Sequence, residues 1–138
     1  MQNTHGQPDI DALIARFYAA FDNRNGLNPQ LADVAGCFTE KATVVRRSSA
    51  DTELYTVSEF ATPRIALLNQ GELLHFHEWE VSSTNQVFGG IAVRTSRYSK
   101  AGLLNGKDYS GSGTKCFLLV DLSFGWRIAS LAWVDDDA

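Results

Sequence analysis

The chain has 138 residues, which corresponds to one domain with a core large enough to fold without disulfides. Hydrophobic residues make up 44% and charged residues 20%, a composition that excludes an intrinsically disordered chain. Twelve basic against sixteen acidic residues give a formal charge of −4, which argues against nucleic acid as a partner. The sequence shows neither a secretory signal nor a membrane span, and its two cysteines are far apart. We therefore expect a cytoplasmic protein with reduced thiols and no membrane contact.

The first third of the chain predicts two helices. Residues 1–8 are polar and predict a disordered tail, so the single domain is expected over residues 9–138. Asp9 is the predicted N-cap of the first helix. Its apolar stripe is spaced as on one helix face and consists of Ile10, Leu13, Ile14, Phe17 and Phe21. NRNG at residues 23–26 ends it, and Pro29 begins a shorter second helix.

Two strands and a third helix are predicted next, over residues 42–47, 54–57 and from Ser58 to about Asn69. Ser58 is the predicted N-cap of that helix, because an acidic residue follows it. Pro63 leaves the helix start open between Glu59 and Thr62, since proline cannot donate a helical hydrogen bond.

From residue 72 onward the chain reads as a four-stranded antiparallel meander. Gly89 and Gly90 form a two-residue turn, which places Val81 opposite Tyr98 and Trp79 opposite Lys100. Residues 101–113 are rich in Gly, Ser and Asn and predict a loose loop or a lid. Two last strands are expected over residues 114–123 and 126–134. The fold class is therefore α+β, with a curved antiparallel sheet and three helices.

Four segments in this order resemble the nuclear transport factor 2-like superfamily, which includes ketosteroid isomerases and SnoaL-like cyclases. They are IDALIARFYAAFDNRN, LADVAGCFTEKATVV, FGGIAVRTSRYSKAG and GWRIASLAWVDDD. The resemblance implies a cone-shaped shell in which three helices pack on the concave face of the sheet and leave a pocket inside. It also implies a homodimer formed through the outer face of the sheet.

The catalytic residues of ketosteroid isomerases are not matched. Phe17 stands where the resemblance would place the oxyanion-hole tyrosine, and Tyr18 is one residue further on. Arg46 stands at the position of the general base, although a guanidinium cannot abstract a proton at neutral pH. The protonated aspartate would fall near Phe117 or Leu118, which are apolar. This chemistry is therefore disfavoured, and the fold alone does not assign another.

Strand alternation sorts the side chains that could line the pocket. His75, His77, Trp79 and Val81 share one face with Ala92, Arg94, Ser96 and Tyr98, and we expect this face to be the concave one. On the last strand Trp126, Ile128, Ser130, Ala132 and Val134 are expected to point inward. The predicted ligand-binding residues are Arg46, Tyr55, Trp79, Arg94, Tyr98 and Ser130. The two arginines would hold an anion, or would instead pair with carboxylates at the rim.

His75 and His77 are the candidate catalytic residues, because both point to one side of a strand and either could act as a base. The alternative is that they only hydrogen-bond to neighbouring groups. A metal site is not expected, since no third ligand is near them in sequence. Glu78 and Glu80 have the opposite parity and are expected to be solvated.

The outer face of the predicted sheet carries an apolar patch, which favours a homodimer. Its expected members are Phe76, Ile91, Val93, Leu131 and Trp133. The leading hypothesis is a small-molecule-binding protein whose compact ligand is anionic or aromatic, with no cofactor. A lyase, isomerase or cyclase with a histidine base and a non-catalytic homodimerisation module are the alternatives.

Overall fold

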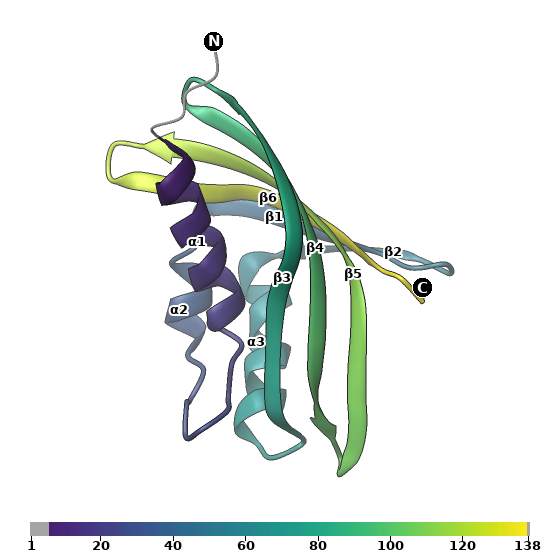
Figure 1. The fold of residues 1–138 in the computed structure, drawn as a ribbon. Helices are drawn as coiled ribbons and strands as arrows, with labels where there is room; N and C mark the ends of the chain where they lie inside the picture. The colour runs from purple at the N-terminus through teal and green to yellow at the C-terminus, as the bar shows by residue number, and fades with distance from the viewer. Residues whose placement is uncertain (1–5, 138) are drawn as a thin grey trace.

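The computed structural model describes residues 6–137 and shows three helices against one curved sheet (Figure 1). The helices are α1 (Gln7–Ala19), α2 (Leu31–Ala35) and α3 (Val57–Asn69). The strands are β1 (Phe38–Arg47), β2 (Thr52–Thr56), β3 (Leu73–Phe88), β4 (Ile91–Leu104), β5 (Lys107–Leu122) and β6 (Gly125–Asp135). The sheet order is β2-β1-β6-β5-β4-β3, and only β1 and β6 run parallel. The α+β class and the antiparallel meander of β3 to β6 are confirmed.

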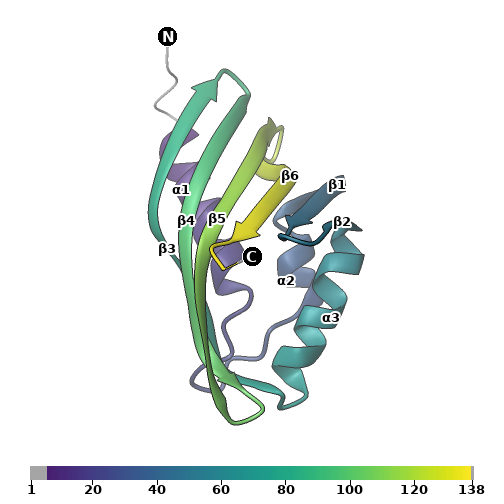
Figure 2. The ribbon, with the colours of Figure 1, turned by 90° about the vertical axis from the view of Figure 1, so that its right-hand side faces the viewer.

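The sheet bends around the helices, so that its concave face and the helices enclose the core (Figure 2). The predicted stripe of α1 is buried, with each side chain at most 4% exposed. Phe17 lies at the centre of this core, where its ring makes edge-to-face contacts with Phe21, Phe38 and Phe117. Helix α1 is thus held on the sheet by aromatic packing, as its spacing predicts.

Helix α1 begins earlier than predicted. Gly6 is its N-cap and Pro8 lies in the first turn, where a missing N–H costs nothing. Asp9 is therefore a residue of the first turn and not the cap. Positions 1–5 of the expected tail lie outside the described residues.

Helix α3 is capped by Thr56 and not by Ser58. The Thr56 hydroxyl accepts a hydrogen bond from the Glu59 N–H at 3.1 Å, and the Glu59 carboxylate accepts one from the Thr56 N–H at 2.8 Å. This reciprocal pair is a capping box, which starts the helix at Val57. Pro63 consequently lies inside the helix, beyond its first turn.

The expected loop over residues 101–113 does not exist, because β4 and β5 pair without interruption up to Leu104 and Lys107. Asn105 and Gly106 form the turn, with φ angles of 51° and 82°. Asn-Gly is the preferred pair for such a turn. The small polar residues on both sides therefore belong to a regular hairpin and not to a lid.

A bulge at Val81 changes the faces predicted for β3. Glu80 pairs with Tyr98 and Ser82 with Arg97, so Val81 is an extra residue without a partner. Such an insertion reverses the side-chain alternation on one side of the bulge. Phe76, Glu78 and Glu80 consequently point inward, whereas Trp79 and Val81 are 40% and 62% exposed. The β4 half of the prediction holds, since Ala92, Arg94, Ser96 and Tyr98 are buried.

A register shift also occurs in β6, where Ala129 is the extra residue between the pairs of Leu118 with Ser130 and Leu119 with Ile128. Beyond it, Leu131 and Trp133 point inward and are buried, while Val134 is exposed. Three of the five residues expected on the outer face, Phe76, Leu131 and Trp133, therefore belong to the core.

Candidate functional site

A cavity of about 320 Å³ lies between α1, α3 and the concave face of the sheet. Aromatic and aliphatic side chains form most of its wall, and ionisable groups from five strands converge on it. Its lining includes Phe17, Phe21, Arg46, Phe60, Arg64, Leu67, Phe76, Glu78, Tyr98, Lys100, Tyr109, Lys115, Leu131, Trp133 and Asp135. Such a mixture of apolar walls and a few converging polar groups is typical of a small-molecule site.

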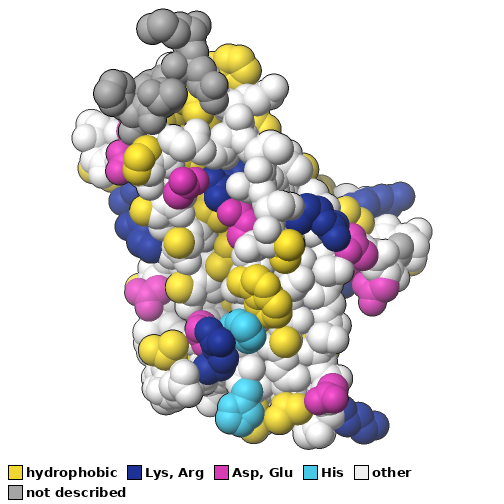
Figure 3. Space-filling view, viewed as in Figure 1, with side chains coloured by type: hydrophobic (Ala, Val, Ile, Leu, Met, Phe, Trp, Pro, Cys, Tyr) yellow, Lys and Arg dark blue, Asp and Glu magenta, His cyan; other side chains and the backbone are white. Residues whose placement is uncertain are grey.

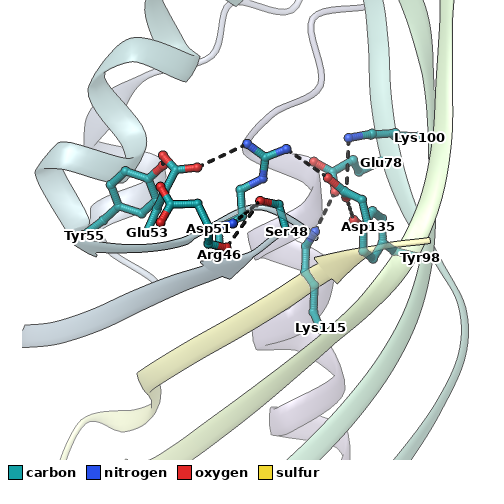
Figure 4. Close-up of polar contacts among 10 residues, drawn as sticks. All are labelled: Arg46, Ser48, Asp51, Glu53, Tyr55, Glu78, Tyr98, Lys100, Lys115 and Asp135. Carbon is teal, nitrogen blue, oxygen red and sulfur yellow. Dashed lines mark hydrogen bonds and ion pairs between the residues drawn. The ribbon is translucent and has the colours of Figure 1, made fainter. Parts of the chain in front are cut away.

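Lys115 on β5 is the most enclosed charged group of this wall. Its side chain is 7% exposed, and its Nζ donates to Oε1 of Glu78 on β3 at 3.0 Å (Figure 4). The same Nζ lies 3.4 Å from the centre of the Tyr98 ring. Burial lowers the pKa of Lys115, because it disfavours the ammonium more than Glu78 favours it.

Asp135 at the end of β6 joins a second set of polar contacts. The Tyr98 hydroxyl donates a hydrogen bond to it, and Arg46 and Lys100 approach it at 3.4 Å and 3.7 Å (Figure 4). Burial opposes its charge, but Tyr98 and these cations outweigh burial and lower the pKa of Asp135. Burial and the hydrogen bond to Asp135 together raise the pKa of Tyr98, so it stays a neutral donor.

Arg64 on α3 forms part of the opposite wall. Its guanidinium lies over the rings of Phe60 and Trp133, at 4.6 Å and 5.3 Å from their centres. It donates one hydrogen bond to the Phe60 carbonyl at 2.8 Å. Among residues 6–137 it faces no carboxylate within ion-pair distance.

The charges of the cavity do not cancel. Four cationic side chains line it, Arg46, Arg64, Lys100 and Lys115, against two carboxylates, Glu78 and Asp135. The cavity therefore carries a positive formal charge whether or not Lys115 is protonated. A low-dielectric wall strengthens the attraction of such a site for an anion.

The structure brings two of the predicted ligand-binding residues, Arg46 and Tyr98, to the cavity wall. Tyr55 lies beside the cavity, with its ring 6.5 Å from that of Phe60 and its hydroxyl hydrogen-bonded to Glu53. That Arg46, Tyr55 and Tyr98 bind a ligand stays a prediction.

The other predicted residues lie elsewhere. Arg94 is buried between the sheet and α1, where it pairs with Glu80 and Asp11. Trp79 stacks on His77 in an open groove between β3 and α1, with ring centres 4.4 Å apart. His75 is exposed, and Ser130 on the outer face of the sheet contacts Thr43 at 3.1 Å.

Neither histidine lines the cavity, and histidine side chains appear on the molecular surface in Figure 3. Neither His75 nor His77 is therefore placed to act as a base on a molecule bound in this cavity.

Glu78, Lys100, Lys115 and Asp135 were not predicted as site residues. Because of the bulge at Val81, simple strand alternation predicts the wrong direction for the side chain of Glu78. Lys115 could have been found, because it alternates with the apolar residues Phe117 and Leu119 of the same strand.

Within the described part of the chain, no three His, Cys, Asp or Glu side chains are grouped so that they could hold a metal ion. No helix of residues 6–137 is both long and apolar enough to span a bilayer.

No protein-family model and no curated protein sequence matches the chain. Solved structures do match it over nearly its full length. A protein of Kribbella flavida has a TM-score of 0.77 at 14% identity, with 96% of this chain and 91% of that chain covered. A nuclear transport factor 2-like superfamily protein of Salmonella enterica has a TM-score of 0.75 at 14% identity, covering 94% and 90%. A nuclear transport factor 2-like protein of Novosphingobium aromaticivorans, described as cystatin-like in fold, has a TM-score of 0.73 at 16% identity, covering 97% and 84%.

These similarities define the class of the protein by its fold. The chain has the cone-shaped α+β fold of nuclear transport factor 2-like proteins, and the resemblance expected from the sequence is confirmed at that level. Sequence identities this low establish the fold but do not assign a function, which must be inferred from the cavity.

Proposed function

We propose that the protein binds a compact aromatic carboxylate in the cavity between α1, α3 and the sheet. One observation carries this proposal: an aromatic cavity with more cationic than acidic side chains in its wall. The volume of about 320 Å³ is near the lower end of the roughly 300–1,000 Å³ found for small-molecule sites, so the ligand is small.

The aromatic part of the ligand would pack against Phe17, Phe60, Phe76 and Trp133. Phe60 and Trp133 already form an edge-to-face pair with ring centres 5.4 Å apart, so this wall is preformed. A preformed wall lowers the entropic cost of binding.

The carboxylate of the ligand would bind Arg64. A guanidinium has five donors and holds a carboxylate with two parallel hydrogen bonds. Arg64 uses one donor on a backbone carbonyl and is steadied by the rings beneath it. It is therefore oriented and still has donors for an anion.

The test is calorimetric titration with 4-methylbenzoate, beside the neutral isostere 4-methylbenzyl alcohol. The acid is expected to bind, and at a hundred times Kd to stabilise the fold by about 2.7 kcal/mol. Arg64→Gln is expected to raise Kd about tenfold, since a charge-assisted hydrogen bond contributes about 1.5–3 kcal/mol.

Arg47→Gln is the matched control, because Arg47 is exposed and its guanidinium contacts Thr52 on the neighbouring strand. Equal binding of the acid and the alcohol, or an equal loss in both variants, would contradict the proposal.

A homodimer through the outer face of the sheet is a second proposal, with corrected residues. Ile91, Val93, Leu118 and Val134 are 40–52% exposed, and Val93 and Leu118 are paired neighbours. Thr95, Cys116 and Ala132 continue this face without charge, which suits a second copy of the same surface.

Light scattering should give a dimer for the wild type and a monomer for Leu118→Glu; a wild-type monomer at high concentration would rule the dimer out.

We also propose a cytoplasmic location, which two free cysteines in so small a protein support.

A further inference from the structure

Lys115 places a primary amine at the cavity. Lysine is rarely buried, because an ammonium loses favourable hydration when it is removed from water. Here the long side chain runs among Tyr18, Tyr98 and Trp133, and its Nζ lies 5.7 Å from the ring centres of Tyr18 and Trp133. Methionine would fill this space without that cost, so packing alone does not account for an amine.

The surroundings of Lys115 are those that make an amine nucleophilic. Desolvation and a neighbouring cation both favour the neutral form, and Lys100 lines the same cavity. In line with this, burial lowers the pKa of Lys115 below its ordinary value. Each decrease of one in the pKa of an amine raises its neutral fraction about tenfold at neutral pH.

Glu78 supplies the proton acceptor that such an amine needs. Its Oε1 is 3.0 Å from Nζ, a hydrogen-bonding distance, and its side chain is 14% exposed. A carboxylate in this position can take a proton from the ammonium and return it later to a leaving hydroxyl.

We propose that Lys115 forms a Schiff base with a small aromatic aldehyde that carries a carboxylate. The inference rests on the proposed function, because Arg64 would hold the carboxylate while the carbonyl carbon approaches Nζ.

The chemistry is balanced without a further reactant. Glu78 removes one proton from the Lys115 ammonium, and the nitrogen lone pair forms a bond to the carbonyl carbon. The nitrogen then gives up one of its own protons to the carbonyl oxygen, which becomes the hydroxyl of a carbinolamine. The C–O bond then breaks as Glu78 returns its proton, so that water leaves and a C=N bond remains. The sum is ammonium plus aldehyde giving a protonated imine plus water, with Glu78 restored and no change of oxidation state.

The experiment treats the full-length protein with 4-formylbenzoate and sodium cyanoborohydride near neutral pH, and locates the reduced adduct by peptide mapping. Lys41 and Lys107 are exposed and serve as internal controls. Lys115 is expected to be labelled at least about tenfold faster than either control. The saturating isostere 4-methylbenzoate, which has no carbonyl group, is expected to protect Lys115 and leave the controls unchanged.

Two variants assign the chemistry. Lys115→Arg should keep the charge and lose the adduct at this position. Glu78→Gln should slow labelling of Lys115 about tenfold and leave labelling of Lys41 unchanged.

The peptide mapping uses wild-type protein, so it tests the proposal even if neither variant folds. Binding of 4-methylbenzoate without faster labelling of Lys115 would overturn the Schiff base and leave the proposed function standing. Faster labelling that 4-methylbenzoate does not reduce, with no binding of that acid, would instead refute the carboxylate site.

Discussion

Arg94 on β4 contacts Asp11 on α1, with 2.6 Å between Nη1 and Oδ1. The side chain of Arg94 is 5% exposed, and its other nitrogens donate to Glu80 on β3. Ser96 extends this chain of contacts, because its hydroxyl donates to Glu80 at 2.6 Å and contacts Tyr18 at 2.8 Å. The network therefore attaches α1 to the sheet by hydrogen bonds as well as by aromatic packing.

Arg94→Met is expected to lower the free energy of unfolding by about 3 kcal/mol, because it leaves Glu80 partly buried without its partner. Binding of 4-methylbenzoate to the folded variant should persist, since Arg94 does not line the cavity. Urea denaturation measures the first effect. Arg97→Met is the control, because Arg97 lies on the same strand and its pair with Asp136 is exposed; an equal loss in both variants would show that burial is not the cause.

Lys115 and Glu78 are expected to be coupled in stability. Each single change, Lys115→Met or Glu78→Gln, leaves the other group enclosed without a partner and should cost about 3 kcal/mol. The double variant removes both charges and should cost less than the sum by more than about 1 kcal/mol. A double-mutant cycle in urea gives this coupling, and additive losses would mean that the 3.0 Å contact is unimportant for stability.

Gly113 is expected to tolerate no side chain. A Cβ there would lie 2.5 Å from the Tyr98 hydroxyl and still closer to the Val134 carbonyl oxygen, which is backbone and cannot move aside. Gly113→Ala should therefore cost about 1–3 kcal/mol and weaken the contact between Tyr98 and Asp135. Gly90→Ala should be nearly neutral in the same thermal unfolding assay, because a Cβ at Gly90 meets nothing within 4 Å; similar losses would contradict the contacts given for Gly113.

The capping box makes a direct comparison possible between two neighbouring hydroxyls. Thr56→Ala should lower stability by about 1 kcal/mol, since it removes the acceptor of the Glu59 N–H. Ser58→Ala should change little, because Ser58 is exposed and bonds only weakly to Thr62, at 3.4 Å. Chemical denaturation of the two variants decides which residue is the cap, and a larger loss for Ser58 would favour the assignment made from sequence.

Stability should fall at alkaline pH. Burial raises the pKa of Tyr18 and of Tyr98, so the folded protein keeps these protons where the unfolded chain loses them, above about pH 10. A raised pKa in the folded state stabilises fully below the unfolded value, and this contribution is lost as the pH rises further. The raised pKa of Lys100 also lowers the stability as the pH rises. The lowered pKa of Lys115 has the opposite effect on stability, at pH values at and below the ordinary pKa of lysine, because the folded protein releases that proton before the unfolded chain does.

The free energy of unfolding in urea, measured from about pH 8 to about pH 11, should therefore decline most steeply above about pH 10. Tyr18→Phe should flatten that decline. A constant stability over this range would mean that the tyrosines ionise alike in both states.

The sequence was a good guide to the fold because helix stripes and turn residues are local signals. The spacing of Ile10, Leu13, Ile14 and Phe17 depends only on the helical repeat. Gly89 and Gly90 set the hairpin register at its start, where Phe88 pairs with Ile91.

The candidate site was harder to predict, because β3 and β6, two of the strands that contribute to it, contain irregularities. Alternation holds in β4 from Ala92 to Tyr98 and fails in β3 beyond Val81 and in β6 beyond Ala129. No residue type marks these bulges, which arise where two strands curve around one core. Arg94 shows a further limit of prediction from sequence. Strand alternation predicted that its side chain points inward, but it did not predict the ion pairs with Asp11 and Glu80 that engage its guanidinium.

The bulge at Val81 also bears on how this scaffold can diversify. Loss of that one residue would reverse the side-chain directions between Val81 and the other register shift of β3, which lies between Leu74 and His77. It would turn Glu78 and Glu80 to the solvent and turn His77 and Trp79 toward the interior. A deletion of a single codon would thus exchange an ion-paired cavity wall for one that presents imidazole and indole groups, with the composition of the chain almost unchanged. Insertion or loss of one residue in this strand would therefore change several side chains of the wall at once, which no single substitution does.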